Sequence, residues 1–194
     1  MPKSTAAINV GSNGTIYVAP VGTVAPVDPF VAWGAAWVDL GYASEDGVTF
    51  NDAKTTERIG VWQMFYAARY IVTERDTMAS FTLRQWDKNT VPLAFGGGTI
   101  TTTAASAGPP VVAAHYLYTP PAPSLIDERA LGIQWEDGAK VYRLIMPRVM
   151  VTEGVETNLT HTNAADLPIT CGVMGVDGAT AWTLRTNDPS FAAA

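Results

Sequence analysis

The sequence predicts a mainly β protein, a two-sheet sandwich or partly closed barrel with one short flanking α-helix and long loops or arms. Three observations predict this fold. Short runs of alternating apolar and polar residues recur along the chain, glycine-containing turns separate many of them, and only one segment, at about residues 87–95, carries helix signals. With 194 residues the chain is long enough to bury a substantial core. We therefore expect a single domain over residues 1–194.

In the first fifty residues we expect short strands around an irregular connection. Residues 14–19 follow a Gly-Ser-Asn-Gly turn, residues 37–42 precede another turn, and alternation resumes at Val48. Residues 20–36 contain three prolines and two glycines, which indicates an irregular connection between strands. Residues 1–12 are expected to form a flexible N-terminal arm.

The segment from residue 52 to residue 84 predicts two long strands around a large loop. Ala79, Phe81 and Leu83 alternate with polar residues, whereas residues 53–60 are polar and indicate a loop. A loop this long is uncommon in a compact domain and is usually functional. The predicted loop, about residues 52–66, is therefore the candidate surface for contact with neighbouring molecules, through Asp52, Lys54, Thr55, Thr56, Glu57, Arg58, Ile59, Val61, Trp62, Gln63 and Phe65.

One short helix and a second series of strands complete the prediction. The helix has polar residues suited to capping at its start and Gly96-Gly97-Gly98 at its end. Residues 99–125, rich in Thr, Ala and Pro, predict an exposed low-complexity excursion with one strand at about 111–118. Further strands are expected at 130–135, 140–151, 155–162, 167–174 and 180–185, the first two joined by a Glu-Asp-Gly turn.

Composition favours a protein that buries part of its surface against other proteins. Only 15% of the residues are charged, against about 25% in a typical soluble protein. Six Trp, seven Tyr and six Phe point the same way, because large aromatic residues are enriched at protein interfaces. The net charge of −6 and the absence of a Lys/Arg cluster argue against specific binding of nucleic acid.

No motif in the sequence indicates catalysis, a cofactor or a metal site. His115 and His161 lie in separate segments without Cys, His or Glu at ligand spacing. Acidic pairs such as Glu45/Asp46 are sequence neighbours, whose side chains point to opposite faces of a strand, so they do not form acid/base pairs. The single cysteine, Cys171, and an N-terminus without an apolar leader predict a cytoplasmic chain without membrane association.

Four features of the chain are informative together: the strand from Asn9 to Pro20 with the small-residue excursion after it, the segment from Trp37 to Phe50, the long hairpin through Trp62 and Gln63, and the helix that ends in three glycines. In this combination the chain resembles the major tail tube proteins of long-tailed bacteriophages, of the non-contractile, siphovirus-like kind. The features cover residues 9–98, about half of the chain, and residues 99–125 have no counterpart among them.

The resemblance implies a structural virion protein without enzymatic activity. Proteins of that kind form hexameric rings that stack into a tube, through which the genome passes into the host bacterium without specific binding. Expected partners are further copies of the chain and the tape measure, tail terminator and tail-tip proteins, with assembly in the host cytoplasm. A heterologous contact that closes makes a ring, and one that does not close makes a filament.

Two alternatives remain open at the level of sequence. A capsid decoration or head–tail joining protein would also be β-rich and oligomeric. A carbohydrate-binding β-sandwich of a tail tip would use exposed aromatic residues such as Trp33, Trp37 and Trp62 to stack on sugars.

Overall fold

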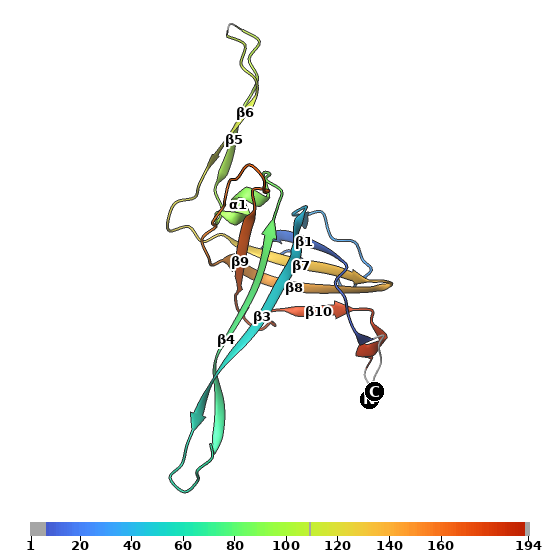
Figure 1. The fold of residues 1–194 in the computed structure, drawn as a ribbon, viewed down its shortest axis with the longest axis vertical. Coiled ribbons are helices and arrows are strands. Elements are labelled where there is room, and N and C mark those ends of the chain that lie inside the picture. The colour runs from blue at the N-terminus through green and yellow to red at the C-terminus, as the bar shows by residue number, and fades with distance from the viewer. Residues whose placement is uncertain (1–6, 109, 193–194) are drawn as a thin grey trace.

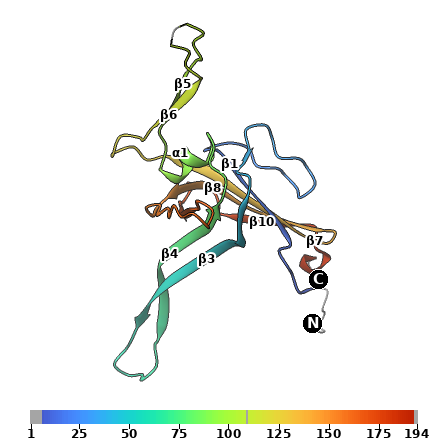
Figure 2. The same cartoon turned by 45° about the horizontal axis from the view of Figure 1, so that its top comes forward.

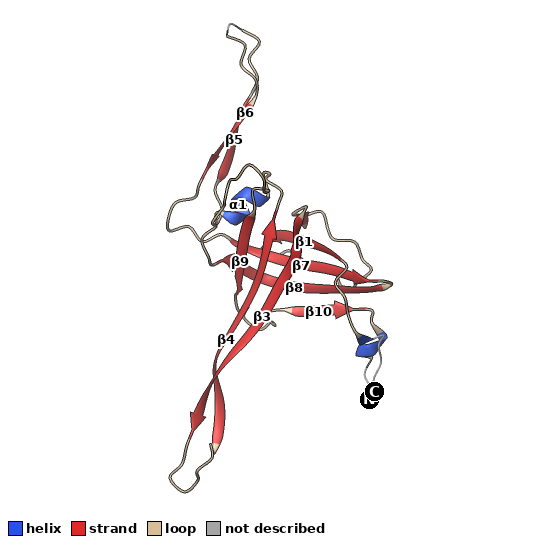
Figure 3. Cartoon of the chain, viewed as in Figure 1, coloured by secondary structure: helices blue, strands red, loops and turns tan. Residues whose placement is uncertain are grey.

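The computed structural model describes residues 7–108 and 110–192. Its elements are, in chain order, β1 (Asn13–Pro20), β2 (Val38–Asp39), β3 (Ala43–Ile59), β4 (Arg69–Leu83), α1 (Thr90–Ala94), β5 (Thr99–Thr103), β6 (His115–Thr119), β7 (Glu128–Asp137), β8 (Lys140–Val151), β9 (Leu167–Val173), β10 (Thr183–Thr186) and a 3₁₀ turn at Pro189–Phe191. The predicted fold class is confirmed: the described chain is mainly β, with two sheets and one short α-helix (Figure 3).

The main sheet is antiparallel and has the order β2-β1-β7-β8-β9-β4-β3. One edge of strand β8 has two partners. Its first half pairs with β10, and its last residues pair with β9. The sheet divides at this point and folds into two layers that do not close into a barrel. Strands β3 and β4 cross over β1, β7 and β8 in Figure 1, and the core lies between the layers.

The core is formed by the apolar side chains that alternate along the strands of both layers and point into the space between them. Leu131 of β7 and Met146 of β8 are fully buried, and they belong to the same cluster as Leu83 of β4 and Ile169 of β9. The predicted inward set Ala79, Phe81 and Leu83 is buried, and so are Leu131 and Ile133. Burial of a Leu or Met side chain contributes about 1.5–3 kcal/mol each, so this cluster is the main source of the fold's stability.

The β3–β4 hairpin extends far beyond the layers (Figures 1 and 2). The two strands stay paired from Asp52 opposite Thr77 out to Ile59 opposite Arg69. At about 3.3 Å per residue, the seven steps from Asp52 to Ile59 carry the hairpin roughly 23 Å from the body. The predicted loop at 52–66 is therefore wrong in its bounds, because β3 continues to Ile59 and the loop occupies residues 60–68.

The helix α1 is shorter than predicted, because it covers residues 90–94 within the predicted 87–95. Asp87 acts at its start, where its carboxylate accepts hydrogen bonds from the backbone N–H groups of Asn89 and Thr90 at 2.7 and 2.9 Å. Gly96, Gly97 and Gly98 end it in left-handed backbone conformations, which glycine adopts without strain. Leu93 and Ala94 join the helix to the core.

Three other segments differ from the sequence predictions. Residues 155–162 are irregular and form no strand. The excursion at 99–125 is a two-stranded hairpin of β5 and β6, which projects from the end of the body opposite to the β3–β4 hairpin (Figures 1 and 2). Of the predicted N-terminal arm, residues 1–6 lie outside the described residues, while Asn9 and Ser12 are bound to Trp135 and Glu136 of β7.

Candidate assembly surfaces

The tip of the β3–β4 hairpin is a cluster of exposed apolar side chains. Trp62 and Phe65 are 99% and 102% exposed, which means that neither contacts the rest of the described chain appreciably. Exposed clusters of this kind mark sites of protein interaction. We define the hairpin tip as residues 58–73, and its exposed large apolar side chains are those of Ile59, Val61, Trp62, Met64, Phe65, Tyr66, Tyr70 and Val72.

Backbone hydrogen bonds give the hairpin tip a defined shape. The N–H of Ala68 donates to the carbonyl of Ile59 at 2.9 Å and closes the loop, and the N–H of Met64 donates to the carbonyl of Val61 at 3.2 Å. The guanidinium of Arg58 donates to the carbonyl of Phe65 at 3.0 Å. The aromatic side chains are therefore presented on a structured turn, which lowers the entropy cost of binding.

At the root of the hairpin, polar side chains of β3 and β4 contact each other. The hydroxyl of Thr77 donates to Asp52 at 2.7 Å, and Arg75 lies 3.9 Å from the same carboxylate. The hydrogen bond from Thr77, followed by the charge of Arg75, lowers the pKa of Asp52. Asp52 therefore links the side chains of β3 and β4 at the point where the hairpin leaves the body.

The predicted contact residues separate into three groups in the structure. Asp52 belongs to the root, whereas Lys54, Thr55, Thr56, Glu57, Arg58 and Ile59 follow the exposed outer half of β3. Val61, Trp62, Gln63 and Phe65 lie in the loop. Met64, Tyr66, Tyr70 and Val72 are also exposed apolar residues of the hairpin tip and were not among the predicted contact residues, although the apolar content of residues 64–72 could have indicated them.

The hairpin tip differs in charge from the rest of the chain. Residues 58–73 include Arg58 and Arg69 and contain no Asp or Glu, while the whole chain has a net charge of −6. The tip is thus a basic and apolar surface on an acidic protein.

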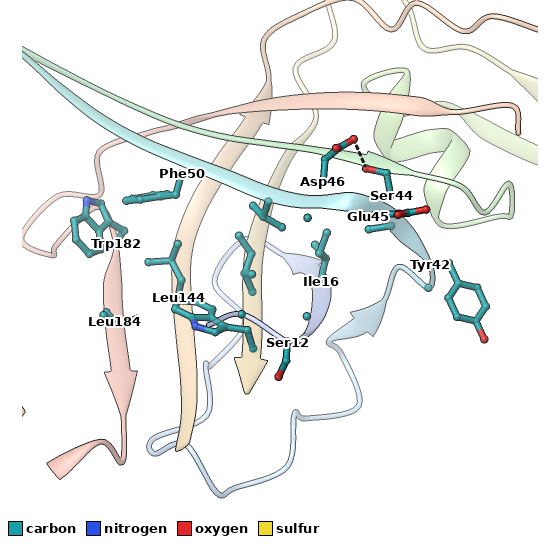
Figure 4. Close-up of a pocket in the computed structure, with 18 residues that line it drawn as sticks. Ser12, Ile16, Tyr42, Ser44, Glu45, Asp46, Phe50, Leu144, Trp182 and Leu184 are labelled. Carbon is teal, nitrogen blue, oxygen red and sulfur yellow. Dashed lines mark hydrogen bonds between the residues drawn. The ribbon is translucent and has the colours of Figure 1, made fainter. Parts of the chain in front are cut away.

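A groove of about 710 Å³ opens between the two layers, beside the edge strand β3 (Figure 4). Phe50 of β3 and Trp182 meet edge to face with ring centroids 5.1 Å apart, and Leu144 of β8 lies beneath them. Ile16, Trp135 and Leu184 continue the apolar lining. The groove is therefore an aromatic and aliphatic channel on the open side of the sandwich.

Two acidic residues are among those that line this groove, and Figure 4 shows the carboxylate of Asp46 turned away from Ile16 and Phe50 and toward Ser44, whose hydroxyl donates to it at 3.3 Å. Residues 44–47 bulge out of the pairing between β3 and β4, since Ala43 is opposite Leu83 and Val48 is already opposite Phe81. Glu45 and Asp46 lie on this bulge, and they are the charged residues of the groove lining. No basic side chain is among the residues that line it.

A second exposed apolar surface lies on the β1–β2 connection, where Val24, Val27 and Phe30 are 82%, 74% and 73% exposed. Arg143 of β8, only 4% exposed, holds this connection by donating to the carbonyls of Asp28 and Val31 at 2.8 and 2.6 Å.

The same connection packs two tryptophans against the outer face of the sheet, Trp37 buried and Trp33 half-buried. Trp37 is 6% exposed, and Trp33 stacks on Tyr17 with centroids 4.4 Å apart. The guanidinium of Arg143 also lies over the ring of Trp33 in a cation–π contact. Neither tryptophan is free to stack on a sugar, so the residues that suggested a carbohydrate-binding sandwich form a core instead, apart from Trp62.

The β5–β6 hairpin is a third projecting surface. Its strands have no buried residue, and Tyr116 and Leu117 are 71% and 62% exposed. It is joined to the body where the hydroxyl of Tyr118 donates to the carbonyl of Gly97 at 2.7 Å.

The described residues include no group of three or more His, Cys, Asp or Glu placed to hold a metal ion. Cys171 is fully buried, and burial raises the pKa of its thiol to about 12. In the part of the chain that is described, no helix has the length and apolar character to span a membrane.

A comparison with known proteins identifies the family of the chain. No curated protein matches the sequence. The profile of one family, described as phage tail tube protein, matches residues 1–194, which is the whole length of the chain. A tail tube protein is a structural component of the virion and assembles with its own copies into a tube. The chain belongs to the phage tail tube protein family.

Proposed function

We propose that the chain forms rings, six copies in each, that stack into the tail tube of a long, non-contractile phage tail. The observation that carries the proposal is the hairpin tip, where the side chains of Trp62 and Phe65 are fully exposed on a structured turn roughly 23 Å from the body. A tip at that distance reaches past its own subunit and is suited to a contact with an adjacent ring.

Contacts within a ring would come from the open edges of the sheet. Strands β3 and β2 are the edge strands of the main sheet and carry unpaired backbone groups. Such edges promote aggregation of a monomer, whereas in an assembly they can pair with strands of neighbouring subunits. Because each edge differs from the other, the contact is heterologous, and closure of such a contact generates a ring.

The proposed tube delivers the genome without binding it. The net charge of −6 opposes retention of DNA, since each phosphate contact by Lys or Arg would hold the strand. Assembly would take place in the host cytoplasm, and the tube would meet the tape measure protein inside it and the tail terminator and tail-tip proteins at its ends.

Electron microscopy of the purified chain tests this function. We expect hollow filaments of regular repeat from the wild-type chain. A variant in which Asn-Gly replaces residues 60–68 joins Ile59 to Arg69 by a two-residue hairpin turn and should remain folded without polymerising. Equal urea unfolding curves of the two proteins are the control for folding.

Two results would overturn the proposal. One is filaments of wild-type length from the tip-replacement variant. The other is a wild-type chain that remains monomeric, or binds to capsids instead, which would favour a decoration or joining protein.

A further inference from the structure

We propose that the groove between β3 and the β1–β7–β8–β10 layer is the receptor for the hairpin tip of a second copy of this chain. The inference rests on the proposed function and deepens it, because it names the surface that receives the tip. Both halves of the contact are present on each copy, as a head-to-tail assembly requires.

The groove has the size and lining that an aromatic tip needs. Its volume of about 710 Å³ falls within the roughly 300–1,000 Å³ of pockets that accommodate drug-sized ligands, which leaves room for aromatic side chains. Phe50, Trp182 and Leu184 offer it an apolar wall. On the tip, Trp62 and Phe65 have no partner surface within the described chain, as their nearly complete exposure shows.

Charge favours the same pairing. Of the two charged residues that line the groove, Asp46 is bound to the hydroxyl of Ser44, so Glu45 is the acidic group that remains for a partner, while Arg58 and Arg69 are the charged residues of the tip. A basic apolar tip that enters the groove beside Glu45 buries its aromatic residues and places opposite charges together at the rim. Such complementarity steers association and selects the register of a contact.

The tip of the same chain cannot occupy its own groove. The groove lies against Phe50, near the point where β3 leaves the body, and the hairpin runs away from that point (Figures 1 and 4). Since the paired strands continue to Ile59 without a turn back, the occupant must come from another copy.

Cross-linking between two singly substituted proteins tests the contact. Met64→Cys places a thiol on the tip, and Glu45→Cys places one at the mouth of the groove. The native Cys171 is buried, and its raised pKa keeps it as an unreactive thiol. We expect a mixture of the two proteins, assembled and then oxidised, to form disulfide-linked dimers. Met64→Cys mixed with Thr102→Cys, an exposed position on β5, should form at least tenfold fewer of them.

An exchange of charges between the tip and the groove tests the same contact without the use of cross-linking. Glu45→Arg and Arg69→Glu should each raise the protein concentration needed for filaments about tenfold, because like charges then meet at the rim. The double variant should return to within about threefold of the wild type. Circular dichroism of each variant identifies any loss of folding.

The outcomes separate this inference from the proposed function. Filaments that form without the cross-link, and that tolerate Glu45→Arg, would overturn the groove as receptor and leave the tube intact. A wild-type chain that forms no filaments would overturn both. Cross-linked dimers together with rescue by the double variant would support both.

Discussion

Arg143 provides the sharpest test of how the β1–β2 connection is held in place. Its side chain makes three hydrogen bonds, to the carbonyls of Asp28 and Val31 and to the amide oxygen of Gln134 at 2.8 Å. The guanidinium carbon also lies 5.1 Å from the ring centre of Trp33. We predict that Arg143→Met destabilises the chain, because methionine keeps much of the alkyl stem but none of the donors.

The magnitude follows from these contacts. Three hydrogen bonds at a net value of about 1 kcal/mol each, with about 0.5–1 kcal/mol from the cation–π contact, give a loss of roughly 3.5–4 kcal/mol. Part of this lost stability is regained because the substitution also removes a buried charge. Burial opposes the charged form of Arg143 and lowers its pKa. We therefore expect the free energy of unfolding to fall by about 2–3 kcal/mol.

Urea unfolding of the monomer measures this change, and hydrogen exchange locates it. Exchange should rise first in residues 21–36, which the guanidinium holds. Arg84→Met is the matched control, because Arg84 forms an exposed ion pair with Asp166 at 3.3 Å and should change the free energy by less than about 1 kcal/mol. A loss for Arg143→Met no larger than that of the control would refute the proposed role of Arg143 as a clamp.

Three further predictions address the packing of Trp33 against the sheet, the C-terminal segment and the hairpin tip. In Gly132→Ala the new methyl group would meet Trp33 at 2.4 Å, so we expect a loss of about 1–3 kcal/mol in urea unfolding, and an unchanged curve would contradict the packing described. The pKa of Asp188 is lowered by hydrogen bonds from the hydroxyl of Tyr142 and the N–H of Ser190, so its contribution to stability is complete above the unfolded value of about 4 and disappears as the pH falls toward the folded value. The stability difference between wild type and Asp188→Asn should accordingly shrink below about pH 4, and a difference independent of pH would be evidence against this contact. Trp62→Ala should leave unfolding within about 0.5 kcal/mol of wild type, because the side chain is 99% exposed, while the concentration needed for filaments rises about 30-fold; a large loss of stability would show that Trp62 packs within its own subunit.

Strands that bury one face were predictable from the sequence. The alternation of Ala79, Phe81 and Leu83 places one face of β4 in the core, and the same pattern in Leu131 and Ile133 defines β7. The Asp-Gly turn between β7 and β8 was also correct, since Gly138 adopts the left-handed conformation that such a turn needs.

The outer half of the long hairpin was not predictable in the same way. Residues 53–59 face solvent on both sides, so no apolar alternation marks them as a strand, and their pairing with the return strand keeps them extended. The opposite error occurred at residues 155–162, where polar residues alternate weakly and the segment pairs with no strand among the described residues.

The groove could not be deduced from sequence because it joins distant segments. Phe50, Leu144 and Trp182 each resemble an ordinary core residue in the sequence, and only the folding of the sheet at β8 brings them to one open channel. Trp62 and Phe65 fall within the predicted loop, and the structure places both side chains at the exposed hairpin tip. That the whole chain is one domain and that the tip binds a neighbour remain predictions.

A cryo-electron microscopy reconstruction of the filament would test most directly whether the β3–β4 hairpin joins copies of the chain. We predict that Trp62 and Phe65, both fully exposed in the single chain, are buried against a subunit of an adjacent ring. A filament in which these side chains point into solvent, with rings joined through other surfaces, would contradict the central role of the hairpin.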